Sequence, residues 1–270
     1  IAFLVMDLIT NGREDLAFTF LNAYLEQTGD YGGIAVLRFY LVYRCLVRAK
    51  VAAIQPGDSS DCGASRSADN SRRYLQIAKI LVNHSTPPRL FITHGFSGVG
   101  KTWLGDRLIG KIPAIRIRSD VERKRLFNLA PGERSDSGVE SGLYTASATD
   151  RTYQHLAGLC DIGLRARFNM IADATFLQRR HRVLFLDLAD RLQVMPVILD
   201  CSAAVETLRN RIRTRATDPQ HVSEADLGVL EHQLAHHDPL TADEKKLTIQ
   251  VSLDQDIDFS TLIQHISSRK

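Results

Sequence analysis

The stretch Gly95-Phe96-Ser97-Gly98-Val99-Gly100-Lys101-Thr102 decides how this chain is interpreted. It matches the pattern G-x-x-x-x-G-K-[ST] in full, and the residues on both sides fit the pattern as well. Residues 90–93 before it predict a short buried strand, while Leu104, Leu108 and Ile109 after it fall on one face of a helix. A strand, a glycine-rich turn and a helix in this order predict a phosphate-binding loop.

Each part of this loop has a predicted role in binding ATP. The glycines let successive backbone N–H groups point inward, and the helix N-terminus adds a partial positive charge. All eight loop residues are therefore predicted to surround the phosphates. Lys101 is expected to reach the β- and γ-phosphates, and Thr102 to offer its hydroxyl to Mg²⁺. The alternative is a glycine-rich turn between two ordinary elements.

Composition narrows the choice of protein class. The chain has 270 residues, enough for one large domain or a domain with a smaller piece, and its net charge is only +3. That charge is not gathered into one block, which argues against nucleic acid as the partner. The four cysteines are far apart, so we expect no disulfide framework or zinc site and a reducing cytoplasm. No apolar run is long enough to span a bilayer.

The N-terminal part is predicted to be helical. Helices are expected over residues 1–9, 13–28 and 34–54, followed by a linker over residues 55–70, which are rich in Pro, Gly, Ser and Asp. The chain begins with Ile1 and lacks the features of a signal peptide, so we expect it to be the remainder of a longer protein. The predicted division is a helical remnant over 1–54, the linker, and an ATP-binding domain over 71–270.

After a further helix at 71–83, apolar strands and helices alternate. Strands are predicted at 90–93, 114–118, 170–174, 194–199 and 247–251. Helices are predicted at 101–110, 120–129, 147–168, 177–191, 203–216, 223–237 and 259–268, with a mobile loop at 130–142. Short apolar strands separated by helices predict an α/β fold, in which a five-stranded parallel sheet is covered by helices on both faces.

Two aspartates are predicted at the carboxyl ends of strands, where open α/β sheets bind their ligands. Asp120 starts a helix, and Arg123 lies three residues further on the same face. Asp120 could accept the proton of a substrate hydroxyl, and Arg123 could hold the substrate, although Ser119 or Asp120 could also simply cap the helix. Asp173 ends an apolar strand, where it could hold a Mg²⁺-bound water beside Thr102 or merely start a turn.

Basic and histidine residues near the C-terminal side provide weaker candidates. Arg211 and Arg215 share a helical face and could close over the transferred phosphoryl group, unless they form a solvated basic face or contact nucleic acid. His232, His236 and His237 could bind a metal, but a solvated helix end explains them equally well.

From about residue 90 to residue 251 the chain resembles the small P-loop kinases grouped with gluconate kinase, polynucleotide 5′-kinase and zeta-type toxins. The resemblance rests on the phosphate loop, on Ser119-Asp120-x-x-Arg123, on Asp173-Ala-Thr and on L-x-x-R-I-x-x-R at 208–215. It implies a P-loop NTPase fold with sheet order 2-3-1-4-5, a mobile lid near 209–225, and phosphoryl transfer to a hydroxyl with Asp120 as the base.

The N-terminal helices resemble the end of an aminoglycoside-phosphotransferase-like domain. The resemblance is carried by F-L-V-M-D-L at 3–8, F-L-N-A-Y-L at 20–25 and R-F-Y-L-V-Y-R at 38–44. It is similar to bacterial two-domain proteins that join such a domain to a P-loop kinase-like domain. The H-G-D loop of that first domain is absent from 1–54, so we expect no aminoglycoside kinase activity from this chain.

The sequence as a whole predicts a kinase that uses ATP and Mg²⁺ and transfers the γ-phosphoryl group to a hydroxyl of a small molecule. Its catalytic residues are predicted to be Lys101, Asp120, Arg123, Arg211 and Arg215, and its metal-binding residues Thr102 and Asp173. Three alternatives stay open: a nucleotide-binding switch without an acceptor, a toxin-type kinase acting on a nucleotide sugar, and a polynucleotide kinase.

Overall fold

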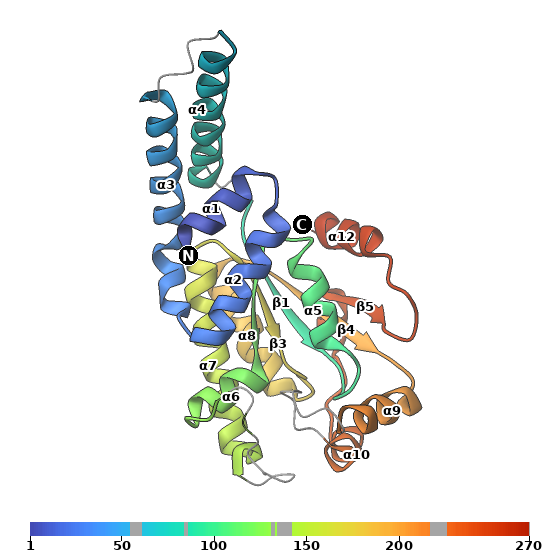
Figure 1. Ribbon diagram of the computed structural model, residues 1–270. Coiled ribbons are helices and arrows are strands. Elements are labelled where there is room, and N and C mark those ends of the chain that lie inside the picture. Colours follow the sequence, from blue (N-terminus) through green and yellow to red (C-terminus); the bar gives the residue numbers. More distant parts are fainter. Residues whose placement is uncertain (55–60, 84–85, 131–132, 134–141, 217–225, 270) are drawn as a thin grey trace.

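A five-stranded parallel sheet forms the centre of the molecule, as the computed structural model in Figure 1 shows. The structure describes residues 1–54, 61–83, 86–130, 133, 142–216 and 226–269. The strands are β1 (Arg89–His94), β2 (Ala114–Arg118), β3 (Asn169–Asp173), β4 (Met195–Ser202) and β5 (Thr248–Ser252). Their order in the sheet is β2-β3-β1-β4-β5, which confirms the predicted fold class and topology.

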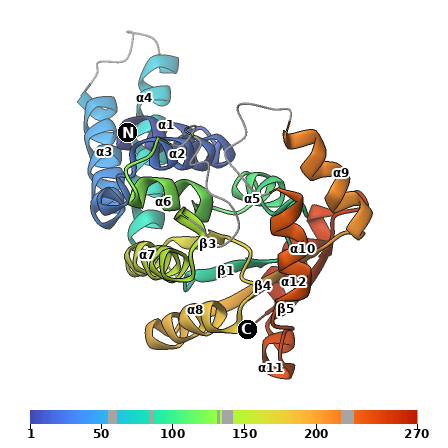
Figure 2. The same cartoon turned by 90° about the horizontal axis from the view of Figure 1, so that it is seen from below.

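Apolar residues at alternate positions of the strands pack into two separate buried clusters, one on each face of the sheet. Ile92, Met170 and Ile198 point to the face covered by α7 (Ala146–Arg165) and α8 (Arg179–Leu192). Phe91 and Ile171 point to the opposite face, covered by α5 (Lys101–Ile109) and α12 (Phe259–Ser268). Figure 2 shows α5 and α8 on opposite sides of the sheet. Burial on both faces explains why the strands are nearly continuous apolar runs.

Shorter helices complete the sheet's surroundings. These are α6 (Ser119–Leu126), α9 (Val205–Ala216), α10 (Leu227–Ala235), α11 (Ala242–Lys246) and the 3-10 turns η1 (Tyr31–Gly33) and η2 (Gly142–Tyr144). Helix α11 was not predicted, although its start carries a recognisable signal. The Thr241 hydroxyl accepts from the Glu244 amide while the Glu244 carboxylate accepts from the Thr241 amide, which is a capping box.

The N-terminal helices α1 (Ala2–Thr10), α2 (Glu14–Thr28) and α3 (Ile34–Ile54) share the core of the sheet. Met6, Leu21 and Leu41 are at most 2% exposed and belong to the same buried cluster as Leu90 and Ile115 of the strands. These helices therefore pack on the sheet itself.

Asn22 fixes α2 to the edge of the sheet. It is buried, and its Nδ2 donates to the Ala114 carbonyl at 2.9 Å while its Oδ1 accepts from the Arg116 amide at 2.6 Å. One side chain thus replaces the neighbouring strand that β2 lacks on its outer side. The N-terminal segment is an integral part of the sheet's edge.

The expected linker over 55–70 is shorter in the structure. Helix α4 begins at Asp61 and ends at Val82, so the helix predicted at 71–83 starts ten residues earlier; residues 55–60 lie outside the described part. Figure 1 shows α4 beside α3, and Ser71 donates to the Ala49 carbonyl across the pair at 3.1 Å. Packing against α3 outweighs the poor helix propensity of Gly and Ser in this segment.

The remaining elements lie within a few residues of their predicted bounds. The helix predicted at 120–129 ends at Leu126, and the one predicted at 223–237 spans Leu227–Ala235. Most of the expected mobile loop (130–142) and the end of the expected lid (217–225) fall outside the described residues. Within the described part of the chain, no helix is long and apolar enough to cross a membrane.

Replacing Asn22 with Ala tests the contact between α2 and the sheet edge. The change leaves the Arg116 amide and the Ala114 carbonyl without their partner in a buried position, so we expect a loss of about 1–3 kcal/mol in the free energy of unfolding. Urea denaturation measures it. The matched variant Asn11→Ala removes an exposed bond to the Asp7 carbonyl and should cost far less; equal losses would contradict the role of Asn22.

Candidate active site

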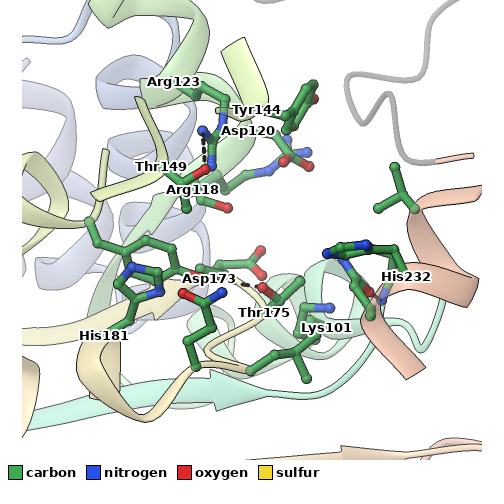
Figure 3. A pocket seen from close by; sticks show the side chains of 18 of the residues that line it. Lys101, Arg118, Asp120, Arg123, Tyr144, Thr149, Asp173, Thr175, His181 and His232 are labelled. Carbon is green, nitrogen blue, oxygen red and sulfur yellow. Dashed lines mark hydrogen bonds between the residues drawn. The ribbon is translucent and has the colours of Figure 1, made fainter. Parts of the chain in front are cut away.

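A cavity of about 270 Å³ lies at the carboxyl ends of the strands. It is lined by the glycine-rich loop, the ends of β2 and β3, and the helices α6, α7, α8 and α10. Figure 3 shows Asp173 in its centre, between Lys101 and Asp120. This is the location expected for a ligand site in an open parallel sheet.

The glycine loop has the backbone conformation that its sequence predicts. Gly95 has φ +141°, and a Cβ there would lie 2.5 Å from the Cys201 carbonyl oxygen, so no other residue fits without a shift. Gly100, with φ +109°, precedes the first residue of α5 and contributes no capping side chain. The N-terminus of α5 therefore keeps its amides available to an anion.

The predicted phosphate-binding residues divide into two groups. Five of them line the cavity: Ser97, Gly98, Gly100, Lys101 and Thr102. The other three do not: Gly95 approaches β4, Phe96 packs edge-on against His237, and Val99 is buried in the core beside α5. The first group forms the candidate phosphate site, and the second fixes the shape of the loop.

The Lys101 ammonium lies against its own loop. Its Nζ donates to the carbonyls of Gly95 at 3.0 Å and Phe96 at 2.8 Å. Both acceptors are neutral, so phosphate oxygens would form stronger, charge-assisted bonds with the same group. Lys101 is thus placed at the loop that it is predicted to serve.

Thr102 and Asp173 form a fitting pair for a divalent cation. Asp173 is 5% exposed, and its Oδ2 is buried without a hydrogen-bond partner. Burial raises the pKa of Asp173, and the nearby cations Arg116, Arg118 and Lys101 oppose that rise. An unsatisfied carboxylate oxygen beside a hydroxyl in the same cavity suits the oxygen preference of Mg²⁺. Among the described residues there is no cluster of three or more His, Cys, Asp or Glu side chains that would form an all-protein metal site.

Asp120 and Arg123 both line the cavity. The alternative, that Ser119 or Asp120 caps the helix, is not observed: the N-cap of α6 is Arg118, with no side-chain capping bond, and Asp120 lies in the first turn. Arg123 is 6% exposed and donates to the Leu143 carbonyl at 2.7 Å. Its Nε is buried without a partner. Asp120 is therefore available for chemistry rather than committed to the helix end.

Arg211 is not among the residues that line the cavity, so its closure over the phosphates stays a prediction. Its guanidinium donates to the carbonyls of Val99 and Leu253, each at 2.7 Å, and so supports the glycine loop from behind. Leu208 and Ile212 of α9 pack into the core next to the loop, which brings Arg211 against the loop. The side chain of Arg215 lies outside the described residues.

Gln233 was not singled out from the sequence, whereas His232 and His236 were named only as possible metal ligands. Gln233 of α10 accepts from the Ser97 amide at 2.9 Å and donates to the Ser97 hydroxyl at 3.0 Å. His232 and His236 of the same helix line the cavity with stacked rings, 4.4 Å apart. Glutamine carries no motif signal at this position, because α10 meets the loop only in the folded chain.

A second unpredicted group forms the opposite wall. Tyr153 stacks on His181 at 3.8 Å, and its hydroxyl lies 3.3 Å from that of Thr175 and accepts from the Phe176 amide. His181 in turn contacts Asp150 at 2.8 Å. These residues come from α7, α8 and the segment after β3. Because they are far apart in the sequence, no local spacing predicts that they lie together.

Comparisons with known proteins agree with this geometry. The sequence model of the AAA domain family matches residues 90–240. Uncharacterised proteins of Mycobacterium tuberculosis and Mycobacterium bovis are 31% identical over 215 residues, which is 80% of this chain but 42% of their own length. The chain therefore spans less than half the length of these curated relatives.

Comparison with solved structures gives one similarity that supports the fold. A candidate kinase from Chloroflexus aurantiacus superposes with a TM-score of 0.52 and 18% identity, covering 68% of this chain and 100% of its own. A sugar kinase from Janibacter gives a TM-score of 0.49 and 21% identity, with 67% and 92% covered. At these identities the first similarity bears on the fold alone.

His181 should make stability depend on pH in the acidic range. Burial lowers its pKa from the ordinary 6.5, although Asp150 partly opposes this. The folded state then binds fewer protons than the unfolded state, so stability present above about pH 6.5 is lost as the pH falls through the lowered pKa. Thermal melts between pH 7 and pH 5 should show a smaller decline in His181→Gln than in the wild type.

The control for this prediction is His265→Gln, on the exposed side of α12. That variant should retain the wild-type decline. An unchanged decline in His181→Gln would show that the acid sensitivity comes from other groups.

Proposed function

We propose that this chain, which belongs to the AAA domain family, is an ATP-dependent kinase that transfers the γ-phosphoryl group to a hydroxyl of a small molecule. The observation that carries the proposal is the convergence of the glycine loop, Lys101, Asp173 and Asp120 on one cavity of about 270 Å³. The P-loop kinase-like fold is consistent with it, and the hydroxyl acceptor is proposed from the place of Asp120 in the cavity.

The phosphates would bind at the N-terminus of α5. The amides of Gly98, Gly100 and Lys101 lie at the cavity, and the helix dipole favours the negative charge there. On binding, the Lys101 ammonium would exchange the carbonyls of Gly95 and Phe96 for phosphate oxygens. Gln233 would likewise give up the Ser97 amide, which it now occupies.

Thr102 and Asp173 would hold Mg²⁺ together with the nucleotide. When bound, the ion neutralises charge on the β- and γ-phosphate oxygens. The protein's contribution is a buried carboxylate whose Oδ2 accepts no hydrogen bond and lies 3.8 Å from Arg116 Nη1.

Asp120 would act as the general base for the acceptor. As the acceptor oxygen bonds to the γ-phosphorus, the bond from that phosphorus to the β,γ-bridging oxygen breaks and ADP leaves with the electron pair. The hydroxyl proton passes to the Asp120 carboxylate. Arg123 lies one helical turn further on and would hold the acceptor, while Tyr153 and His181 would form the wall against it.

A nucleotide-dependent switch is the second candidate, and one observation favours it. Gln233 links α10 directly to the Ser97 amide of the phosphate loop, so nucleotide binding would move α10 even if no acceptor were used. Such a coupling suits a regulatory module. The two candidates differ in whether Asp120 matters for turnover.

We further propose that residues 1–54 are the end of an aminoglycoside-phosphotransferase-like domain, and that the ATP-binding part begins after residue 70. The sequence patterns of the first three helices support this, and so does the greater length of the mycobacterial relatives. In this proposal the sequence divides at the linker over 55–70, although α2 packs on the edge of the sheet.

Metabolite-stimulated ATP consumption tests the kinase proposal. With Mg²⁺ and pooled hydroxyl-bearing metabolites, we expect one pool to raise turnover above the background rate. Lys101→Ala and Asp120→Asn should each reduce that increase by about 100-fold or more, because they remove the phosphate-binding cation and the base. The product is identified by splitting the active pool.

Arg213→Ala provides the control, since Arg213 is exposed and its nearest acidic partner is Glu206 at 3.9 Å. It should behave as the wild type. If ATP binds, no pool stimulates turnover, and Asp120→Asn leaves the basal rate unchanged, the kinase proposal fails and the switch replaces it.

A further inference from the structure

We propose that Glu26 of α2 is a positioning residue of the active site, which keeps Asp173 available to the metal–nucleotide complex by holding Arg118 toward α2 and sharing the charge of Arg116. This rests on the kinase proposal above. Glu26 lies outside the part of the chain that matches the family, residues 90–240. It comes from the N-terminal segment that the sequence assigns to another domain.

Glu26 is aimed at the site by the rest of α2. Asn22 lies one turn earlier on the same helix face. It hydrogen-bonds to the Ala114 carbonyl and the Arg116 amide of β2. That attachment places the Glu26 carboxylate at the end of β2, where Oε1 accepts from Arg118 at 2.6 Å and Oε2 lies 3.6 Å from Arg116. The main chain is fixed as well, because Arg125 of α6 donates to the Glu26 carbonyl at 2.6 Å.

Arg116 connects Glu26 to the metal-binding pair. Its side chain is 5% exposed, and its Nη1 donates to the Thr102 carbonyl at 2.9 Å. The same nitrogen lies 3.8 Å from Asp173 Oδ2, and Nη2 pairs with Asp106 at 2.8 Å. Gly105 makes room for it, since a Cβ there would lie 2.9 Å from Arg116 Cδ. One buried guanidinium thus contacts the backbone carbonyl of Thr102 and the carboxylate of Asp173, the two predicted metal-binding residues.

The charges explain why Glu26 is needed. Arg116 and Arg118 lie close to Asp173, whose Oδ2 has no hydrogen-bond partner at present. Without Glu26, Asp173 becomes the nearest buried carboxylate that can accept from either arginine. A direct bond would then neutralise the oxygen that the metal requires. Outer residues of this kind tune metal sites without touching the metal.

Arg118 gives Glu26 a second effect on the cavity. Arg118 lines the cavity, so the residue that orients it also sets where its charge points. Burial opposes the charge of Arg118, but Glu26, Asp173 and Asp120 outweigh burial and hold the pKa of Arg118 above its ordinary value. Glu26 keeps this cation directed toward α2 rather than toward Asp173.

The test measures nucleotide binding with and without Mg²⁺ in Glu26→Gln. The nucleotide is ADP, followed by calorimetry. In the absence of Mg²⁺ we expect wild-type affinity, because the loop and Lys101 bind the phosphates. The Mg²⁺ concentration needed for half of the metal-dependent gain in affinity should rise about 10-fold or more. A change restricted to the metal-dependent part is what a purely structural role would not produce.

Two further variants make the outcome decisive. Asp15→Asn removes an exposed carboxylate that pairs with Arg13 on the same helix, and it should leave both affinities unchanged. Glu26→Asp keeps the charge but shortens the side chain, so it should give an intermediate Mg²⁺ requirement. This variant also provides the answer if Glu26→Gln does not fold.

An unchanged Mg²⁺ requirement in both Glu26 variants would overturn the proposal. So would equal losses of affinity with and without Mg²⁺, which would indicate a role in packing alone. Failure of the kinase proposal is a separate result, seen in the wild type as ADP and ATP binding without transfer to any acceptor.

Discussion

The buried guanidinium of Arg116 is the contact on which the arrangement of this molecule depends. It lies where the edge strand β2, the first turn of α5, the end of β3 and the N-terminal helix α2 meet. A buried cation must be surrounded by acceptors, and here the acceptors come from three elements: Glu26 of α2, Thr102 and Asp106 of α5, and Asp173 of β3. The need to satisfy one charge therefore sets the relative positions of the phosphate loop, the metal-binding carboxylate and the N-terminal segment.

Polar contacts from other side chains also hold the phosphate loop in shape. Lys101 bonds to the loop's own carbonyls, Gln233 occupies the Ser97 amide, and Arg211 supports Val99 from behind. Each contact gives a hydrogen-bond partner to a polar group of the loop or of Lys101. The loop is consequently ordered by side chains from α9 and α10, elements more than a hundred residues away in sequence.

Local sequence predicted the sheet and the phosphate loop, because both depend on neighbouring residues. The glycines at 95, 98 and 100 need particular backbone angles, and apolar runs bounded by turns identify the strands. The strand order followed from the resemblance to P-loop kinases. The helical period placed Asp120 and Arg123 on one face, and both line the cavity, but a period does not show what the face of Arg211 meets. Gln233, Glu26 and the His181–Tyr153 pair depend on contacts between distant elements, for which one sequence carries no signal.

The shared core of α1–α3 and the sheet limits how this protein can be divided or recombined. Met6 and Leu21 lie in one buried cluster with Leu90 and Ile115, and Asn22 completes the outer side of β2. A gene fragment that began at the first strand would encode every recognisable motif and yet lack one wall of its own interior. The unit that folds is thus larger than the stretch that holds the recognisable motifs. A recombined gene that carries the phosphate loop and its sheet would also have to encode these helices.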